Sequence, residues 1–164
     1  MASNAIEHLQ AAATVEPDVE SLIGVEQVAE RIVDAATTLS APFAARVVGV
    51  GAGTVNVQVA EALYSAALQA MVNSLQHAGS GKGIERWLHI DGVDADGLEI
   101  EIGDTGVGFD VEAVPAERLG LRVSIVERVT NAGGCVSIVS RPEKGAAIRI
   151  RWPNPDSVDG EAAL

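Results

Sequence analysis

The sequence predicts an α+β fold: a two-layer sandwich with a mixed, mostly antiparallel sheet and about three helices on one face of it. Three observations indicate this class. Long segments with a helical spacing of apolar residues are separated from pairs of short, alternating strands. Tight turns join the strands of each pair, which favours hairpins over the crossovers of a parallel sheet. The 164 residues are 48% hydrophobic, enough to bury one sizeable core.

The first half of the chain contains two predicted helices and a strand. Within residues 21–41, apolar side chains at positions 25, 28, 29, 32, 33 and 36 have the spacing of a helix. The segment "FAARVVGVGAG" predicts a strand that ends in a glycine turn. A long helix over about residues 57–78 follows, and Gly79 is a usual stop signal.

Two hairpins and a third helix make up the second half. The first hairpin runs from "ERWLHIDGV" through the turn "DADG" to "LEIEIGD", where apolar residues alternate with glutamates. The segment "VEAVPAER" predicts an irregular connection, and "LGLRVSIVERVTNAGG" predicts a helix that ends at two glycines. The last hairpin joins "CVSIVS" to "AAIRIRWP" through the turn "RPEKG".

These elements suggest one domain over residues 21–153. We expect residues 1–20 to be flexible, or a linker at the end of a preceding helical region, and residues 154–164 to be a disordered tail. No apolar run approaches a membrane span and no signal pattern is seen, so we expect a cytoplasmic domain without direct membrane contact. The single cysteine, Cys135, excludes an internal disulfide, and its apolar surroundings predict a buried thiol. The net charge of −12 argues against nucleic acid as a partner.

Three stretches carry candidate chemistry, although each has an ordinary structural explanation. The stretch "IGDTGVGFD" places Asp104 and two glycines directly after a strand, as a turn also does. In the long helix, polar residues recur in steps of four, and Gln69 to His77 span about 12 Å, the scale of a triphosphate; a solvated helix face looks the same. In "RLGLRVSIVERV", Gly120 at a predicted helix N-terminus lies beside Arg118 and Arg122, which suits phosphate but also an ordinary cap.

Together, in this order and spacing, the stretches resemble the ATP-binding fold that gyrase B, MutL, the large heat-shock chaperone and histidine kinases share. "LQAMVNSLQHA" resembles the asparagine box of sensor histidine kinases, "DTGVGFD" their first glycine box, and "RLGLRVSIVERV" their second. "GGCVSIVSRPEKGAAIRIRWP" resembles their closing hairpin. The resemblance covers roughly residues 20–153 and implies the catalytic ATP-binding domain of a bacterial two-component sensor histidine kinase.

The resemblance also implies roles for single residues. Asp104 would accept a hydrogen bond from the adenine N6 amine, and Asn73 would ligate Mg²⁺ beside the phosphates of ATP. His77 matches a basic residue near the phosphates. The other implied nucleotide-binding residues are Gly106, Val107 and Gly108 at the start of a lid, Leu119, Gly120, Leu121 and Arg122 at the phosphate end, and Ala146 near the adenine.

Three positions depart from the family pattern. Gln69 stands where the family has a glutamate that orients or activates the nucleophile, and an amide cannot take up a proton at neutral pH. Its role as the candidate catalytic residue is therefore open. Ala146 replaces a threonine, and Arg118 replaces the first glycine of the second glycine box. The first two departures bear on turnover more than on nucleotide binding.

The implied reaction transfers the γ-phosphoryl group to a histidine on a separate dimerisation domain of the same kinase, which then serves a response regulator. None of the histidines, His8, His77 and His89, lies in a helical hairpin followed by an acidic residue. The chain is then either a piece of a larger kinase, cytoplasmic itself or the cytoplasmic part of a membrane-bound sensor, or a stand-alone relative. Two alternatives stay open: a regulatory serine kinase of the anti-sigma-factor kind, and a degenerate nucleotide-sensing module.

Overall fold

The computed structural model describes residues 21–113 and 116–158, with the backbone alone for residues 116–121 and 158. Within these ranges the chain forms seven strands and four helices. The strands are β1 (Leu22–Gly24), β2 (Ala44–Val48), β3 (Thr54–Asn56), β4 (Arg86–Val93), β5 (Gly97–Asp104), β6 (Cys135–Ser140) and β7 (Ala146–Trp152). The helices are α2 (Val25–Thr37), α3 (Val57–His77), α4 (Ala116–Asn131) and α5 (Pro155–Val158).

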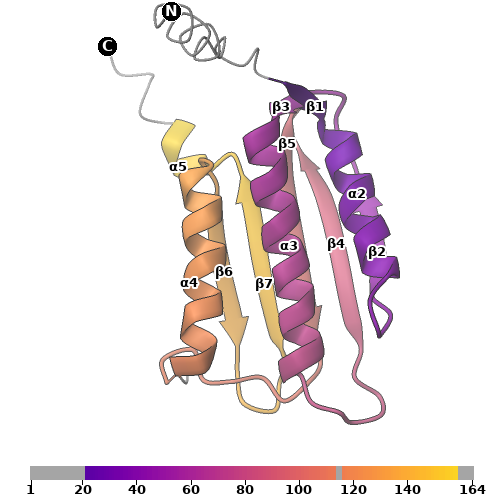
Figure 1. The fold of residues 1–164 in the computed structure, drawn as a ribbon, viewed down its shortest axis with the longest axis vertical. Coiled ribbons are helices and arrows are strands. Elements are labelled where there is room, and N and C mark those ends of the chain that lie inside the picture. Colours follow the sequence, from indigo (N-terminus) through magenta and orange to yellow (C-terminus); the bar gives the residue numbers. More distant parts are fainter. Residues whose placement is uncertain (1–20, 114–115, 159–164) are drawn as a thin grey trace, which may run out of the picture.

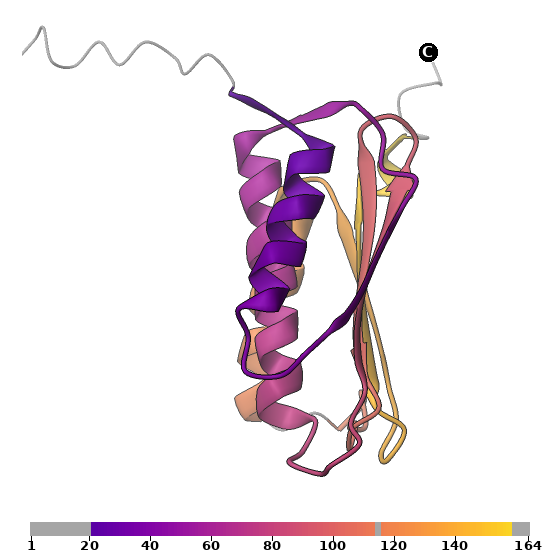
Figure 2. The ribbon, with the colours of Figure 1, turned by 90° about the vertical axis from the view of Figure 1, so that its right-hand side faces the viewer.

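The architecture is a two-layer sandwich, as predicted. Five strands form one sheet in the order β2-β4-β5-β7-β6, and only the β2–β4 pair is parallel. Helices α2, α3 and α4 lie on the same face of this sheet, which Figure 2 shows edge-on. The predicted mixed, mostly antiparallel sheet with three helices on one face is therefore confirmed.

Most of the core side chains that the sheet contributes lie in two rows that run across the strands, and Leu98 lies beyond them. Because the strand register pairs residues directly, each row is a set of neighbours on the face that the helices cover. The first row is Ile90, Ile100, Ile150 and Val136, and the second is Leu88, Ile102, Ile148 and Ile138. A third row at the end of the strands consists of Arg86, Asp104, Ala146 and Ser140. The apolar rows form the core, and the third row reaches the candidate site.

The long helix α3 is the central helix of its layer, between α2 and α4 (Figure 1). Its buried face is rich in alanine, including Ala66, Ala67 and Ala70, together with Leu63 and Met71. Small side chains let the helix backbone lie close to its neighbours, and α3 contacts α2, α4, β5 and β7. The side chain of Asn56 caps its first turn by accepting a hydrogen bond from the Val59 N–H at 2.8 Å. Because α3 packs against β5 and β7, its last two turns lie above the ends of these strands.

The structure differs from the predicted elements in four places. The short strands β1 and β3 pair with each other; three residues are too few to show alternation. Helix α4 begins at Ala116, so the end of the expected irregular connection is helical and Gly120 lies inside the helix, not at its N-terminus. The expected disordered tail contains α5, while residues 159–164 and 1–20 lie outside the described residues. Cys135 is only partly buried at the start of β6.

No helix in the described ranges has both the length and the apolar character needed to cross a membrane.

Candidate functional site

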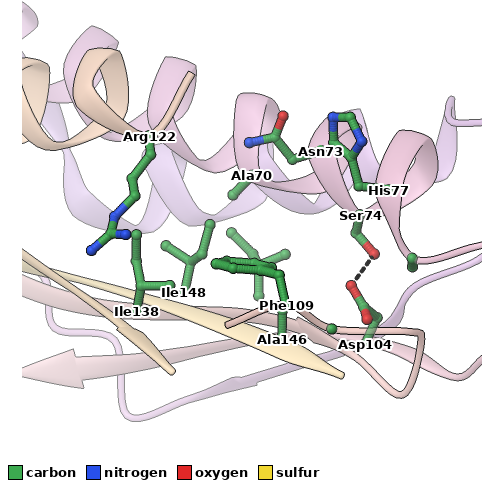
Figure 3. Close-up of a pocket in the computed structure, with 13 residues that line it drawn as sticks. Ala70, Asn73, Ser74, His77, Asp104, Phe109, Arg122, Ile138, Ala146 and Ile148 are labelled. Carbon is green, nitrogen blue, oxygen red and sulfur yellow. Dashed lines mark hydrogen bonds between the residues drawn. The ribbon is translucent and has the colours of Figure 1, made fainter. Parts of the chain in front are cut away.

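A pocket lies between the last two turns of α3 and the ends of β5, β6 and β7. Figure 3 shows Asp104 and Ser74 at one end of it and Arg122, reaching down from α4, at the other, while Asn73 and His77 line it from α3. The lining residues are Ala70, Asn73, Ser74, His77, Ala78, Ile102, Asp104, Gly108, Phe109, Arg122, Ile138, Ala146 and Ile148. Isoleucines from the second apolar row form its floor, so the pocket continues directly from the core.

Asp104 is the last residue of β5 and is only 5% exposed. Its Oδ2 accepts a hydrogen bond from the Ser74 hydroxyl at 2.7 Å, and its Oδ1 accepts one from the Gly106 N–H at 2.9 Å. A carboxylate offers about four lone-pair positions, so acceptor capacity remains on the side that faces the pocket. The side chain is thereby held in place as a buried acceptor.

The two glycines after Asp104 are required by close backbone contacts. A Cβ at Gly106 would lie 2.2 Å from the carbonyl oxygen of Ala78, and one at Gly108 would lie 2.1 Å from that of Arg141. Gly108 also has a φ of 57°, which side chains disfavour. Between them, the Val107 N–H donates to the Ala78 oxygen at 2.9 Å. The loop therefore threads between the end of α3 and the β6–β7 turn.

Phe109 follows this loop, and its ring lies in the pocket between α3 and the strands (Figure 3). Its N–H donates to the Ser140 hydroxyl oxygen at 2.9 Å, and the Ser140 hydroxyl donates to the Gly145 carbonyl at 2.9 Å. Ser140 thus connects the glycine loop to the β6–β7 hairpin. Neither Phe109 nor Ser140 was predicted from the sequence to belong to the site.

The structure brings together six of the predicted site residues. Asn73 and His77 line the pocket from successive turns of α3, since residues four apart share a helix face. Gln69 lies one further turn back and is not among the lining residues. Ala146 is the register neighbour of Asp104. The six that line the pocket are Asn73, His77, Asp104, Gly108, Arg122 and Ala146.

The remaining predicted residues do not line the pocket or lie outside the description. Gly106 contributes its backbone N–H to Asp104, and the Val107 side chain is half exposed. The backbone of Leu119, Gly120 and Leu121 is part of α4, but their side chains lie outside the described residues. The Arg122 guanidinium donates to the Val111 carbonyl at 3.3 Å, which ties α4 to the segment after the glycine loop.

Sequence reasoning missed the apolar part of the pocket: Ala70, Ala78, Ile102, Ile138 and Ile148, besides Ser74 and Phe109. A signal for the isoleucines was present, because they occupy the inward positions of alternating strands. Deciding which inward positions border a pocket requires the strand register. That register depends on pairing between distant segments.

The side chains whose pKa values are clearly shifted lie away from the pocket. The hydrogen bond from Arg31 lowers the pKa of Glu61, in a surface pair that joins α2 to α3. On the uncovered face of the sheet, the hydrogen bond from Arg149 lowers the pKa of Glu101.

Within the described residues, no three acidic, histidine or cysteine side chains gather to hold a metal ion. Among the pocket residues, Asn73 has an amide oxygen, a hard donor of the kind that could ligate a cation.

The fold and the pocket define a class of protein: an α+β sandwich with a pocket between its central helix and one end of its sheet. Residues 58–156 match the family model described as histidine kinase-, DNA gyrase B-, and HSP90-like ATPase. The chain belongs to this family.

One curated protein and two solved structures are similar to this chain. An uncharacterized sensor-like histidine kinase of Chloroflexus aurantiacus is 35% identical over 100 residues, which are 58% of this chain and 16% of that protein. This chain thus corresponds to a small part of that relative. The histidine kinase domain of a blue-light activated kinase from Erythrobacter litoralis superposes with a TM-score of 0.61 at 21% identity, covering 80% of this chain and 65% of that one. The ATP-binding domain of PrrB from Mycobacterium tuberculosis gives a TM-score of 0.56 at 20% identity, with 82% and 97% covered. At these identities the structures show a shared fold.

Proposed function

We propose that this chain is the ATP-binding catalytic domain of a sensor histidine kinase. It presents Mg-ATP so that the γ-phosphoryl group passes to a histidine on a separate dimerisation domain. The observation that carries the proposal is the pocket itself, with a buried acceptor, Asp104, at one end and Asn73 and Arg122 toward the other. Family membership and the histidine kinase relative support the same assignment.

At the base end, Asp104 accepts a hydrogen bond from the adenine N6 amine. Its burial and its two fixed donors support this role, because a held acceptor discriminates better than a mobile one. Ala146, its neighbour in the sheet, leaves room for the flat base beside the apolar floor. Gly108 begins the lid over the nucleotide. Gly106 and Val107 hold the start of this lid against the end of α3.

At the phosphate end, the Asn73 amide oxygen would hold Mg²⁺, because a hard cation prefers oxygen ligands. The Mg²⁺ supplies charge neutralisation for the phosphates when it is bound. The Arg122 guanidinium, at the end of the pocket away from Asp104, adds a positive donor group, and His77 lines the pocket one turn beyond Asn73, on the Ser74 side. The first turn of α4, which includes Leu119, completes this end, because its N–H groups have no partner within the helix, and Gly120 and Leu121 follow inside the helix.

The transfer step needs positioning more than covalent assistance from this domain. The bond between the γ-phosphorus and the bridging oxygen breaks, a bond to the accepting imidazole nitrogen forms, and ADP leaves. Gln69 lies one turn behind Asn73 on the same face of α3 and acts there as a neutral positioning group. It lacks the proton-accepting capacity of a carboxylate.

The partners and the location of the domain follow from its proposed role as the ATP-binding part of a histidine kinase. The partners are the dimerisation domain of the same kinase and, downstream, a response regulator of a two-component system. The domain covers residues 21–153 and works in the cytoplasm, without direct contact to nucleic acid or membrane.

Calorimetric titration of the chain with Mg-ATP, Mg-ADP and Mg-GTP tests the proposal. We expect adenine nucleotides to bind and Mg-GTP to bind much more weakly, because guanine has a carbonyl where adenine has an amine. Adding a cognate dimerisation domain with labelled ATP should then yield phosphohistidine. Absence of adenine nucleotide binding would refute the proposed function.

A further inference from the structure

Three side chains form a hydrogen-bonded series that ends at the base end of the pocket. Arg86 is the first residue of β4 and the register neighbour of Asp104. Its Nε donates to the Ser74 hydroxyl oxygen at 3.1 Å, and the Ser74 hydroxyl donates to Asp104 Oδ2 at 2.7 Å. Ser74 lines the pocket, whereas Arg86 is not among the lining residues. Any influence of Arg86 on a ligand therefore passes through Ser74.

Arg86 fixes the direction of this series. A guanidinium has donors and no acceptor, and a hydroxyl has a single proton to donate. Because Arg86 occupies an acceptor position of the Ser74 oxygen, the Ser74 proton is directed to Asp104. On the other carboxylate oxygen, the Gly106 N–H donates at 2.9 Å. The base end of the pocket thus offers acceptors and no free hydroxyl donor from Ser74.

We propose that Arg86 is a specificity-determining positioning residue: through Ser74 it keeps the base end of the pocket an acceptor, and so selects adenine over guanine nucleotides. This inference rests on the proposed function. Adenine presents an N6 amine donor where guanine presents an O6 acceptor. Without Arg86, the Ser74 hydroxyl is free to rotate and donate to O6, which lowers the penalty against GTP.

A purely structural role for Arg86 makes a different prediction. Its Nη2 also approaches the Ser74 carbonyl oxygen, at 3.5 Å, in the last turn of α3. A cation stabilises a helix C-terminus, so loss of Arg86 also loosens the contact between α3 and β4. Such loosening weakens ATP and GTP binding in parallel. A selective role changes the ratio of the two affinities.

The test is calorimetric titration of the full chain with Mg-ATP and Mg-GTP. We expect the ratio of ATP to GTP affinity to fall about 3- to 10-fold in Arg86→Met, the size of one hydrogen bond. The double variant Arg86→Met/Ser74→Ala should keep the wild-type ratio, because it has no hydroxyl to donate to guanine. Ser74→Thr keeps the hydroxyl and should keep the ratio. Arg46→Met is the matched control, because Arg46 lies on the edge strand β2 and pairs with the exposed Asp91.

An unchanged ratio in Arg86→Met, or equal losses for both nucleotides, would overturn the inference. If circular dichroism shows that Arg86→Met does not fold, Arg86→Gln replaces it, because its neutral amide can also accept and no longer fixes the direction of the Ser74 proton; the same fall in the ratio is expected. A wild-type chain that binds neither nucleotide overturns the proposed function as well. A wild-type chain that prefers ATP, with an Arg86→Met variant that keeps this preference, overturns this inference alone.

Discussion

Gly108 and Arg141 approach each other so closely that a Cβ on the glycine would lie 2.1 Å from the arginine carbonyl oxygen. The contact joins the glycine loop after β5 to the turn between β6 and β7. It fixes where the loop leaves the sheet, and therefore where Phe109 enters the pocket.

Replacing Gly108 by alanine should destabilise the domain and weaken nucleotide binding. The positive φ of 57° alone costs an alanine about 1–2 kcal/mol, and the clash adds to this. Gly49→Ala is a matched control, because Gly49 has a φ of 65° and no atom within 4 Å of its added Cβ. Urea denaturation should show a clearly larger loss of unfolding free energy in Gly108→Ala. Equal losses would mean that the loop moves aside without cost.

Asp104→Asn should weaken ATP binding about 10- to 100-fold, since a hydrogen bond to a charged group contributes about 1.5–3 kcal/mol. The amide keeps the shape of the side chain while halving its acceptors. Calorimetry gives the dissociation constants, and Asp91→Asn on the open face of the sheet is the control. An ATP affinity within a factor of about two of the wild type would remove Asp104 from the base site.

Asn73→Ala should weaken Mg-ATP binding by about tenfold, the effect of roughly 1.4 kcal/mol, and metal-free ATP binding by much less. The reason is that the lost oxygen belongs to the metal ion. Titrations with Mg²⁺ and with a chelator provide the comparison. Gln76→Ala, an exposed position on the same helix, should change neither value. Equal weakening in both titrations would argue against Asn73 as a ligand.

Gln69→Glu should raise the slow hydrolysis of ATP by about 10²-fold, the lower range for a general base, with little change in ATP affinity. Phosphotransfer to a supplied dimerisation domain should stay the same, because the accepting imidazole is itself a good nucleophile. Gln58→Glu adds the same charge near the start of α3, far from the pocket, and should leave both rates unchanged. Hydrolysis that stays at the wild-type rate would show that position 69 does not act as a base.

Glu101 gives a prediction for pH dependence. The Arg149 guanidinium donates to it at 2.6 Å and the Trp87 indole at 2.9 Å, and the bond from Arg149 is the larger cause of its lowered pKa. A carboxyl with a lowered pKa in the folded state stabilises the fold above its unfolded pKa, and this stabilisation is lost as pH falls. The difference in unfolding free energy between wild type and Glu101→Gln should therefore be constant near pH 7 and shrink below about pH 4.5.

We expect this difference to be below about 1 kcal/mol, because the Arg149 side chain is half exposed and water screens the pair. Denaturation series at pH 3, 4, 5 and 7 supply the measurement. A difference that grows on acidification would contradict the assigned direction of the shift.

The sequence predicted the helices and hairpins well because their periodicities are local. The spacing along α3 placed Asn73 and His77 on one face, and alternation along β5 ended at Asp104. Ser74 and Arg86 could not be paired from the sequence, since their contact depends on how α3 lies over β4. The ring of Phe109 was missed for a similar reason: its position depends on contacts with Ala78, Ser140 and Arg141, which belong to distant segments.

The small ribbon of β1 and β3 has a mechanical consequence. The carbonyl oxygen of Ser21 accepts a hydrogen bond from the N–H of Val57, the first residue of α3, at 2.9 Å. Leu22 pairs with Asn56, which caps the same helix. A pull or twist applied at Ser21 is therefore transmitted straight to the first turn of α3 without passing through the five-stranded sheet. Because α3 is one uninterrupted helix from Val57 to His77, the other end of that lever is its last two turns, which carry Asn73 and His77.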